Sequence, residues 1–470
     1  MQKKISKNAE TNMFFVIMSL AWPTMLEQLM QTAVQYIDTA MVSSLGTQAT
    51  AAVGSTTTVN WLLGSSISAL SIGFLAFIAQ TLGAGDRELA KRAVAQAVLA
   101  VLVVGSVFTV MALSLSDMIP VWMQVKEEIR DTASQYFFIL YTPMMFRTAT
   151  IIFGTVLRAA GDTRTPMKLG IVVNVTNVIL NMLLIYPTRP VFGGAFTMPG
   201  AGLGVIGAAA ASAVAIAVGG ILITIVLWRH PEVSPKGQKL VPDMQILRPC
   251  LRVAFPNMLQ RFGTSLGYVV FASMINSLGE VAMAAHTIAN TVESAFYIPG
   301  YGMQTASATL AGNAYGANDE KRMKSLAKMF IPIEIGLMTL SGGALFVAAP
   351  VLVQIFSSSE EVIALGSAVL RMVALSEPFY GFSIIIEGMM QGVGKTKLPF
   401  VFNIIGMWMI RIVGTFICTQ MMGYGLVSAW GCMIAHNMFL FLMFLICYIR
   451  GTWNPLSDGK VHLKFKRKEE

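Results

Sequence analysis

An aspartate, Asp38, lies in the middle of a long apolar segment near the start of the chain, within MQTAVQYIDTAMVSSLG. Glu27, Gln31 and Gln35 precede it at helical spacing, so a helix would place all four side chains on one stripe. A carboxylate in an apolar membrane helix is costly unless it faces a cavity or a partner. The stripe therefore predicts a polar helix face that lines a cavity.

A carboxylate in that position could bind either of two cations, H⁺ or Na⁺. A carboxyl group removed from water holds its proton more readily, which suits it to carry protons. Together with amide and carbonyl oxygens, the ionised form could instead bind Na⁺, a hard cation that prefers oxygen ligands. The alternative is structural: Asp38 only makes hydrogen bonds that fix helix packing.

Three asparagines form a second polar set. Asn174, Asn177 and Asn181 recur at helical spacing and share one helix face. Such a face predicts either hydrogen bonds between helices or ligands placed beside Asp38.

Glu293 heads an acidic and aromatic set in the second half of the chain. Tyr297 and Tyr301 follow it by one and two helical turns, beside a break expected at Pro299. A carboxylate next to aromatic faces suits an amphipathic cation. The alternative is an acid that packs near the helix break. No His, Cys or carboxylate set has metal-ligand or catalytic spacing, so we expect neither a metal enzyme nor another enzyme.

The elements that position these residues are membrane-spanning helices. The 470-residue chain is 55% hydrophobic and 12% charged, and its mean hydropathy is +0.66. The basic residues are spread over short turns rather than gathered in a nucleic-acid footprint. Twelve apolar segments are long enough to cross a bilayer: 14–44, 50–82, 92–116, 132–157, 167–187, 202–228, 247–278, 282–315, 325–356, 362–391, 399–422 and 425–449.

The distribution of Lys and Arg predicts the orientation. Most of them fall in the turns that lie on the same side as the two termini, and only Lys126, Arg130 and Arg189 fall on the opposite side. The positive-inside rule then places both termini in the cytoplasm of a multi-pass protein of the cell membrane. Five basic residues lie within segments: Arg147, Arg252, Arg261, Arg371 and Arg411.

The two halves of the chain are a repeat with one constant offset. AWPTML at 21–26 falls on AFPNML at 254–259, and GAGD at 83–86 falls on GAND at 316–319. The repeat predicts an all-α fold with two six-helix lobes, 1–228 and 247–450. A linker at 229–246 joins them and a basic tail at 451–470 follows. Both lobes start on the same side, so their pseudo-two-fold axis runs along the membrane normal, with the cavity between them.

The motifs resemble those of the multidrug and toxin extrusion (MATE) family. In the first half these are Pro23, Asp38, Gly46, QTLGAGD (80–86), LRAAGDTRTP (157–166) and NVTNVILN (174–181). In the second half they are AHTI (285–288), GNAYGAND (312–319) and QGVGKTKLP (391–399). The resemblance implies cation-coupled export of amphipathic, often cationic, small molecules, and it runs over nearly the whole chain.

The resemblance also implies roles for single residues. It places ion coupling at Asp38 and adds Ser212, where relatives often have a hydroxyl, to Asn174, Asn177 and Asn181. Proton-coupled relatives often carry an aspartate at the position of Asn181, so the ion stays open: H⁺ carried by Asp38, or Na⁺ held by Asp38, Asn177 and Asn181.

Further features of the resemblance concern the branch and the substrate. NorM-like relatives carry acids where this chain has Thr264 and Tyr380, which indicates the DinF-like branch. The expected substrate contacts are Glu27, Gln31, Gln35, Glu293, Tyr297 and Tyr301.

Other functions are less well supported by the sequence. A lipid-linked flippase of the same superfamily would need a more cationic cavity than the dispersed in-span arginines provide. A receptor or scaffold would not explain the buried stripe. We expect a monomer in the lipid bilayer with no cofactor beyond the coupling ion, and Glu334, Glu377 and Glu387 receive no role.

Overall fold

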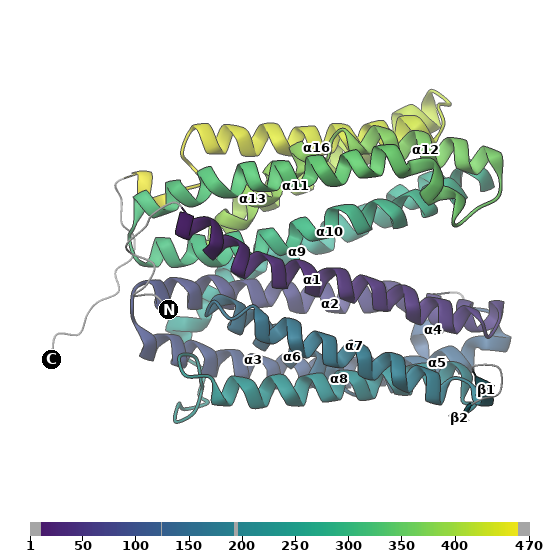
Figure 1. The fold of residues 1–470 in the computed structure, drawn as a ribbon, viewed down its shortest axis with the longest axis horizontal. Coiled ribbons are helices and arrows are strands. Elements are labelled where there is room, and N and C mark those ends of the chain that lie inside the picture. Colours follow the sequence, from purple (N-terminus) through teal and green to yellow (C-terminus); the bar gives the residue numbers. More distant parts are fainter. Residues whose placement is uncertain (1–10, 124, 192–195, 459–470) are drawn as a thin grey trace. The chain divides into compact units, whose positions relative to one another are not determined.

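The computed structural model describes residues 11–458 apart from 124 and 192–195. Long helices make up most of this part of the chain (Figure 1). Those of the first half are α1 (Thr11–Ser43), α2 (Thr47–Gly83), α3 (Arg87–Ser114), α4 (Met118–Trp122), α5 (Glu127–Tyr141), α6 (Met144–Ala159), α7 (Arg164–Leu184) and α8 (Gly204–Arg229).

The second half follows the same plan with one irregular span. Its α-helices are α9 (Met244–Asn276), α10 (Glu280–Gly316), α11 (Glu320–Gln354), α12 (Glu360–Ala374), α13 (Glu377–Gly392), α14 (Lys397–Ile405), α15 (Val413–Thr415) and α16 (Leu426–Ile449). Two π-helical stretches, η3 (Gly406–Ile412) and η4 (Phe416–Met421), continue α14 and α15, and a short 3₁₀ helix, η5 (Pro455–Asp458), follows α16.

The helix boundaries reproduce the sequence repeat. The offset that relates AWPTML to AFPNML also relates the first residues of α1, α2, α3, α5, α6 and α7 to those of α9, α10, α11, α12, α13 and α14. In each half one span is bent, by 47° between α5 and α6 and by 52° between α12 and α13. A proline stands beside each bend, Pro143 and Pro378, and proline cannot donate the backbone hydrogen bond that a straight helix needs.

The twelve apolar segments all correspond to these helices. In the described residues eight helices are long and apolar enough to cross a membrane, and ten spans result when each bent pair counts once. The remaining two segments lie in α9 and α10, the counterparts of α1 and α2. The only β-structure in the part of the chain that is described is a hairpin between α7 and α8, in which β1 (Pro187–Val191) pairs antiparallel with β2 (Phe196–Ala201).

The turns explain the repeated glycine motifs. Gly46 and Gly279 both have positive φ, of 112° and 107°, and end equivalent turns. Gly85 of GAGD has a φ of 81°, and its counterpart Asn318 of GAND has 54°. Asparagine is among the few residues that tolerate this left-handed conformation, so the change from GAGD to GAND preserves the turn.

The described helices form two compact units. One contains the start of α1 up to Met25, residues 75–86 and the chain from Arg252 onward; the other contains residues 26–74 and 87–251. This division by contacts passes through α1 and α2, so it differs from the division by repeat, and the lobe boundaries stay a prediction. In the first unit, Ile17 on α1, Leu310 on α10, Phe330 on α11 and Phe444 on α16 share one buried core.

Glycines bring α2 and α10 into backbone contact within the first unit. A Cβ on Gly83 would lie 2.1 Å from the carbonyl oxygen of Asn313, and a Cβ on Gly316 would lie 1.8 Å from that of Gln80. Gly83 and Gly316 are repeat counterparts, as are Gln80 and Asn313. Each helix therefore contributes an equivalent glycine to the contact. Small residues at a crossing of membrane helices let the two backbones approach closely.

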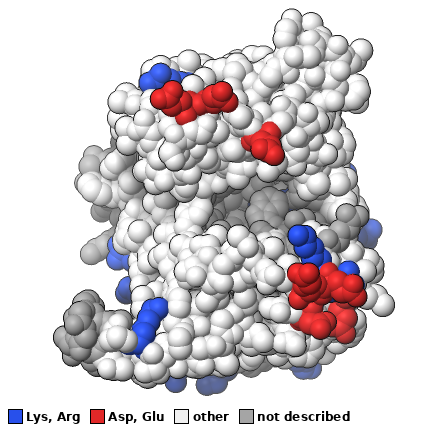
Figure 2. All heavy atoms as spheres, turned by 90° about the vertical axis from the view of Figure 1, so that its right-hand side faces the viewer, with Lys and Arg blue, Asp and Glu red and all other residues white. Residues whose placement is uncertain are grey.

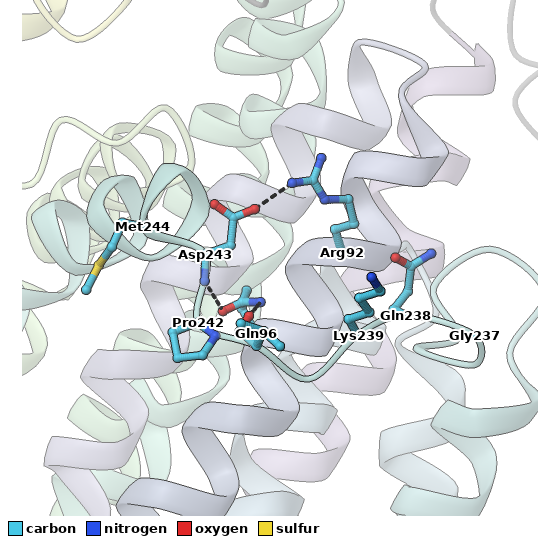
Figure 3. A pocket seen from close by; sticks show the side chains of 9 residues that line it. Arg92, Gln96, Gly237, Gln238, Lys239, Pro242, Asp243 and Met244 are labelled. Carbon is cyan, nitrogen blue, oxygen red and sulfur yellow. Dashed lines mark hydrogen bonds and ion pairs between the residues drawn. The ribbon is translucent and has the colours of Figure 1, made fainter.

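The linker between the two halves is attached to α3 in the second unit (Figure 3). The side chain of Gln96 donates to the carbonyl of Val241 at 2.8 Å and accepts from the amide of Asp243 at 3.0 Å. Arg92 forms an ion pair of 2.6 Å with the Asp243 carboxylate. A pocket of about 650 Å³ lies between these groups and the linker backbone. Because Gln96 pairs with both backbone groups, the end of the linker is fixed to this unit.

Candidate functional site

Four predicted residues form one hydrogen-bonded row in the second unit. The Asn181 amide donates to Asp38 Oδ1 at 2.6 Å and to Asn177 Oδ1 at 3.1 Å. The Asn177 amide in turn donates to Ser212 Oγ at 3.0 Å. The row joins α1, α7 and α8, and it brings the aspartate, two asparagines and a hydroxyl into one site.

Helix packing explains how the row is held. The asparagines occupy consecutive turns of α7, and α7 packs along α8, which carries Ser212. Gly207 on α8 allows the close approach, since a Cβ there would lie 2.4 Å from the carbonyl oxygen of Leu184. Asn177 and Asn181 are buried, with 5% and 1% of their surface exposed. These packed helices thus hold the buried Asn181 so that its amide donates to the Asp38 carboxylate.

Two atoms of the asparagines have no hydrogen-bond partner among the described residues. These are Asn181 Oδ1 and Asn174 Nδ2, both buried. Asn174 is therefore outside the row, although it lies on the same helix. The Asn181 oxygen, next to the carboxylate, is the kind of neutral oxygen that cations accept as a ligand.

The rest of the predicted stripe on α1 has a different environment. Glu27 accepts hydrogen bonds from Arg158 Nη1 at 3.1 and 3.0 Å through its two carboxylate oxygens, so its charge is compensated. Gln31 and Gln35 are exposed. Spacing on one helix could not reveal the partner of Glu27, because Arg158 comes from α6, far away in sequence.

The acidic and aromatic set lies in the first unit. Glu293 is buried, and the rings of Tyr297 and Tyr301 meet edge to face at 5.8 Å. Tyr380 joins them from α13: its hydroxyl lies 3.0 Å from that of Tyr301, and its ring lies 6.3 Å from Tyr297. The sequence indicates Tyr380 only as the replacement of an acid, and the structure adds it to the aromatic set.

Three further acids lie in this unit: Glu334 and Glu377 are buried, and Glu387 is half-buried. Both carboxylate oxygens of Glu334 and Oε2 of Glu377 have no hydrogen-bond partner among the described residues. Glu387 Oε1, in contrast, accepts from the amides of Gln260 at 2.8 Å and Gln391 at 3.2 Å. The bond between Gln391 and Glu387 could be predicted from the sequence, because the two residues lie four apart on one helix.

A repeat of long apolar helices around buried polar groups defines a multi-pass membrane protein, and comparison with known proteins agrees. The family model described as MatE matches residues 23–183 and 256–417. The two matches begin at Pro23 and Pro256, which are repeat counterparts, and this confirms the repeat. The chain belongs to the MatE family, whose members are transporters and not enzymes.

Similar proteins cover nearly the full chain. The probable multidrug resistance protein NorM of Thermotoga maritima is 27% identical over 438 residues, 93% of this chain and 92% of that protein. The probable multidrug resistance protein YoeA of Bacillus subtilis is 26% identical over 424 residues, 87% of each. A crystal structure of MATE in the bent conformation has a TM-score of 0.85 at 22% identity and covers 95% of this chain and 97% of that one.

Proposed function

We propose that this transporter is a cation-coupled antiporter that exports amphipathic, often cationic, small molecules by alternating access. The observation that carries the proposal is the buried row from Asp38 through Asn181 and Asn177 to Ser212. A single carboxylate held against neutral amides inside a membrane bundle changes charge when a cation binds. That change is what a coupling site requires.

The donor set accommodates either coupling ion. Asp38 supplies the only charge of the row and holds H⁺ directly as the carboxylic acid. For Na⁺ the carboxylate is supplemented by the oxygens of Asn177 and Asn181, and Asn181 Oδ1 has no competing donor among the described residues. Cation binding favours one conformation over the other by the difference in affinity between the two states.

The substrate class follows from the acidic and aromatic set and from the relatives. Glu293 with Tyr297, Tyr301 and Tyr380 offers one carboxylate and several ring faces, which suits a lipophilic cation. The curated relatives named above are probable multidrug resistance proteins. Glu27 is a weaker candidate contact than Glu293, since Arg158 already neutralises it.

We place the protein in the cell membrane as a monomer, with both termini in the cytoplasm. Charge supports the orientation. On the face shown in Figure 2 most atoms belong to uncharged residues, and acidic side chains gather in small groups. The first turns of α5 and α12 carry acidic pairs, Glu127 with Glu128 and Glu360 with Glu361. Only Lys126, Arg130 and Arg189 are basic in the turns predicted to lie outside, which agrees with the positive-inside rule.

The test is efflux from sealed vesicles that contain the purified protein, with a pH gradient and a Na⁺ gradient imposed separately. One gradient should drive efflux, which identifies the ion. Asp38→Asn should insert normally and reduce driven efflux to the level of protein-free vesicles. Glu280→Gln, which changes an exposed acid at the start of α10, should transport normally. Driven efflux at the wild-type rate by Asp38→Asn would contradict the proposal.

A further inference from the structure

Arg411 is a buried guanidinium with a free edge. It lies in the π-helical stretch η3, has 3% of its surface exposed, and its Nε and Nη2 have no hydrogen-bond partner among the described residues. These two nitrogens form the edge of the guanidinium that pairs with a carboxylate through two parallel hydrogen bonds. A buried charge without a partner is costly, and π-helical stretches are often found at functional sites.

Two aromatic rings of α9 pack against the guanidinium group of Arg411. The guanidinium carbon lies 4.1 Å from the centre of the Phe271 ring and 4.7 Å from that of Tyr268. Phe271 is the residue that the repeat aligns with Asp38. The first repeat has an acid at this position, whereas the second has an aromatic ring with a cation on it. In the second repeat a positive charge of the protein itself, the Arg411 guanidinium, therefore lies at the position equivalent to Asp38.

Glu293 is the acid of α10 that lies in the same region as Arg411, because its neighbour Val292 shares a buried cluster with Phe271 and with Ile412, the residue that follows Arg411. The side chains of Glu293 and Arg411 form no ion pair within 4.0 Å among the described residues. The ring of His286, two helical turns before Glu293 on α10, packs edge to face against Phe271 at 5.6 Å. Pro299 interrupts the hydrogen bonds of α10 close to Glu293, which gives this part of the helix freedom to shift.

We propose that Arg411 is a tethered cation that competes with the cationic substrate for Glu293. In the state described here Glu293 is not paired with Arg411, and a cationic substrate would compete with Arg411 for it. When the two pair, the free edge of Arg411 is satisfied and the substrate is displaced. The inference deepens the proposed function, because it rests on Glu293 as the contact for cationic substrates, and it adds a residue that determines specificity for charge.

Direct binding tests this proposal without any ion gradient. Equilibrium dialysis of the purified full-length protein measures the Kd of tetraphenylphosphonium, a permanent lipophilic cation, and of triphenylphosphine oxide, a neutral molecule of similar shape. Arg411→Met removes the competitor while it keeps an apolar stem, so tetraphenylphosphonium should bind about tenfold more tightly. Binding of the neutral probe should not change. The matched control is Arg371→Met, because Arg371 also lies over a ring, that of Phe346 at 5.7 Å, but is exposed.

A second set of variants keeps the proposal testable if Arg411→Met misfolds. Arg411→Lys keeps the charge but lacks the two-pronged edge, so it should bind tetraphenylphosphonium more tightly than the wild type by a smaller factor. In the Glu293→Gln background neither Arg411 variant should change the Kd. Equal Kd values for the wild type and both Arg411 variants would overturn the proposal, and so would a gain that persists without Glu293. The vesicle assay judges the coupling function separately, since it measures driven efflux and not binding.

Discussion

At the scale of single residues, charge compensation separates the acids of this transporter into different roles. Glu27 and Arg158 form an ion pair of 3.0 Å in which the side chains are 13% and 16% exposed. Asp38 has only amide and hydroxyl groups in its row. A compensated acid stabilises the helices that it joins, whereas an uncompensated one can respond to a cation.

The pair between Glu27 and Arg158 is expected to be structural. Glu27→Gln or Arg158→Met alone leaves one charge without its partner, and each should cost about 1–3 kcal/mol of stability. The double variant removes both charges and should recover most of that loss. Thermal unfolding in detergent measures the effect, with Glu88→Gln as the control, because the Glu88–Lys91 pair is exposed and contributes little. Additive losses in the double variant would contradict a direct pair.

The candidate site shows what helical spacing can and cannot predict. Spacing placed Asn177 and Asn181 on one face of their helix and put Asp38 on a polar stripe. The 2.6 Å contact between Asn181 and Asp38 depends on the packing of α1 against α7, which no local pattern contains. For the same reason the ring on which Arg411 lies could not be predicted, since Phe271 belongs to another helix.

At the scale of helices, the crossing of α2 and α10 depends on two glycines. The carbonyl oxygens of Gln80 and Asn313 occupy the space that a Cβ at Gly316 and Gly83 would fill. Lipid gives no hydrophobic drive for helices to associate, so close backbone packing is a main source of stability here. The repeat makes the two sites equivalent, and substitutions in them should have equal effects.

Alanine at either glycine should separate the two helices. For Gly83→Ala and for Gly316→Ala we expect a loss of about 1–3 kcal/mol, because a backbone atom must move away from the new methyl group. The melting temperature in detergent measures the loss. Gly336→Ala in α11 is the matched control, since its Cβ would meet nothing within 4 Å. A melting temperature unchanged in both glycine variants of the crossing would contradict the packing.

Regular helices could be predicted from the sequence, and irregular ones could not. Apolar length and the repeat located all twelve segments, because both are properties of the chain itself. The bends beside Pro143 and Pro378 have a local cause in the proline ring. The π-helical stretches Gly406–Ile412 and Phe416–Met421 have no such signal, since apolar residues fit an α-helix equally well.

At the scale of the whole molecule, the number of spans and the orientation are linked. Three helices, α9, α10 and α11, separate the linker at 230–243 from the turn that precedes α12. If each of them crosses the membrane, Lys236 and Ser358 lie on opposite sides. The distribution of basic residues predicts that Lys236 lies in the cytoplasm. Because α9 and α10 are less apolar than the other spans, this part of the topology needs a direct test.

Single cysteines at these two exposed positions report the side of the membrane on which each lies. The background replaces the four native cysteines by alanine, of which Cys250 and Cys447 are buried. Ser358→Cys should react with a membrane-impermeant maleimide in intact cells, and Lys236→Cys only after the membrane is permeabilised. Labelling of both in intact cells would mean that an even number of helices separates them, so α9, α10 and α11 could not all be spans. Labelling of Lys236→Cys alone would keep the three spans and invert the orientation, because the number of crossings fixes the relation between the two sides and the basic turns select which side is the cytoplasm.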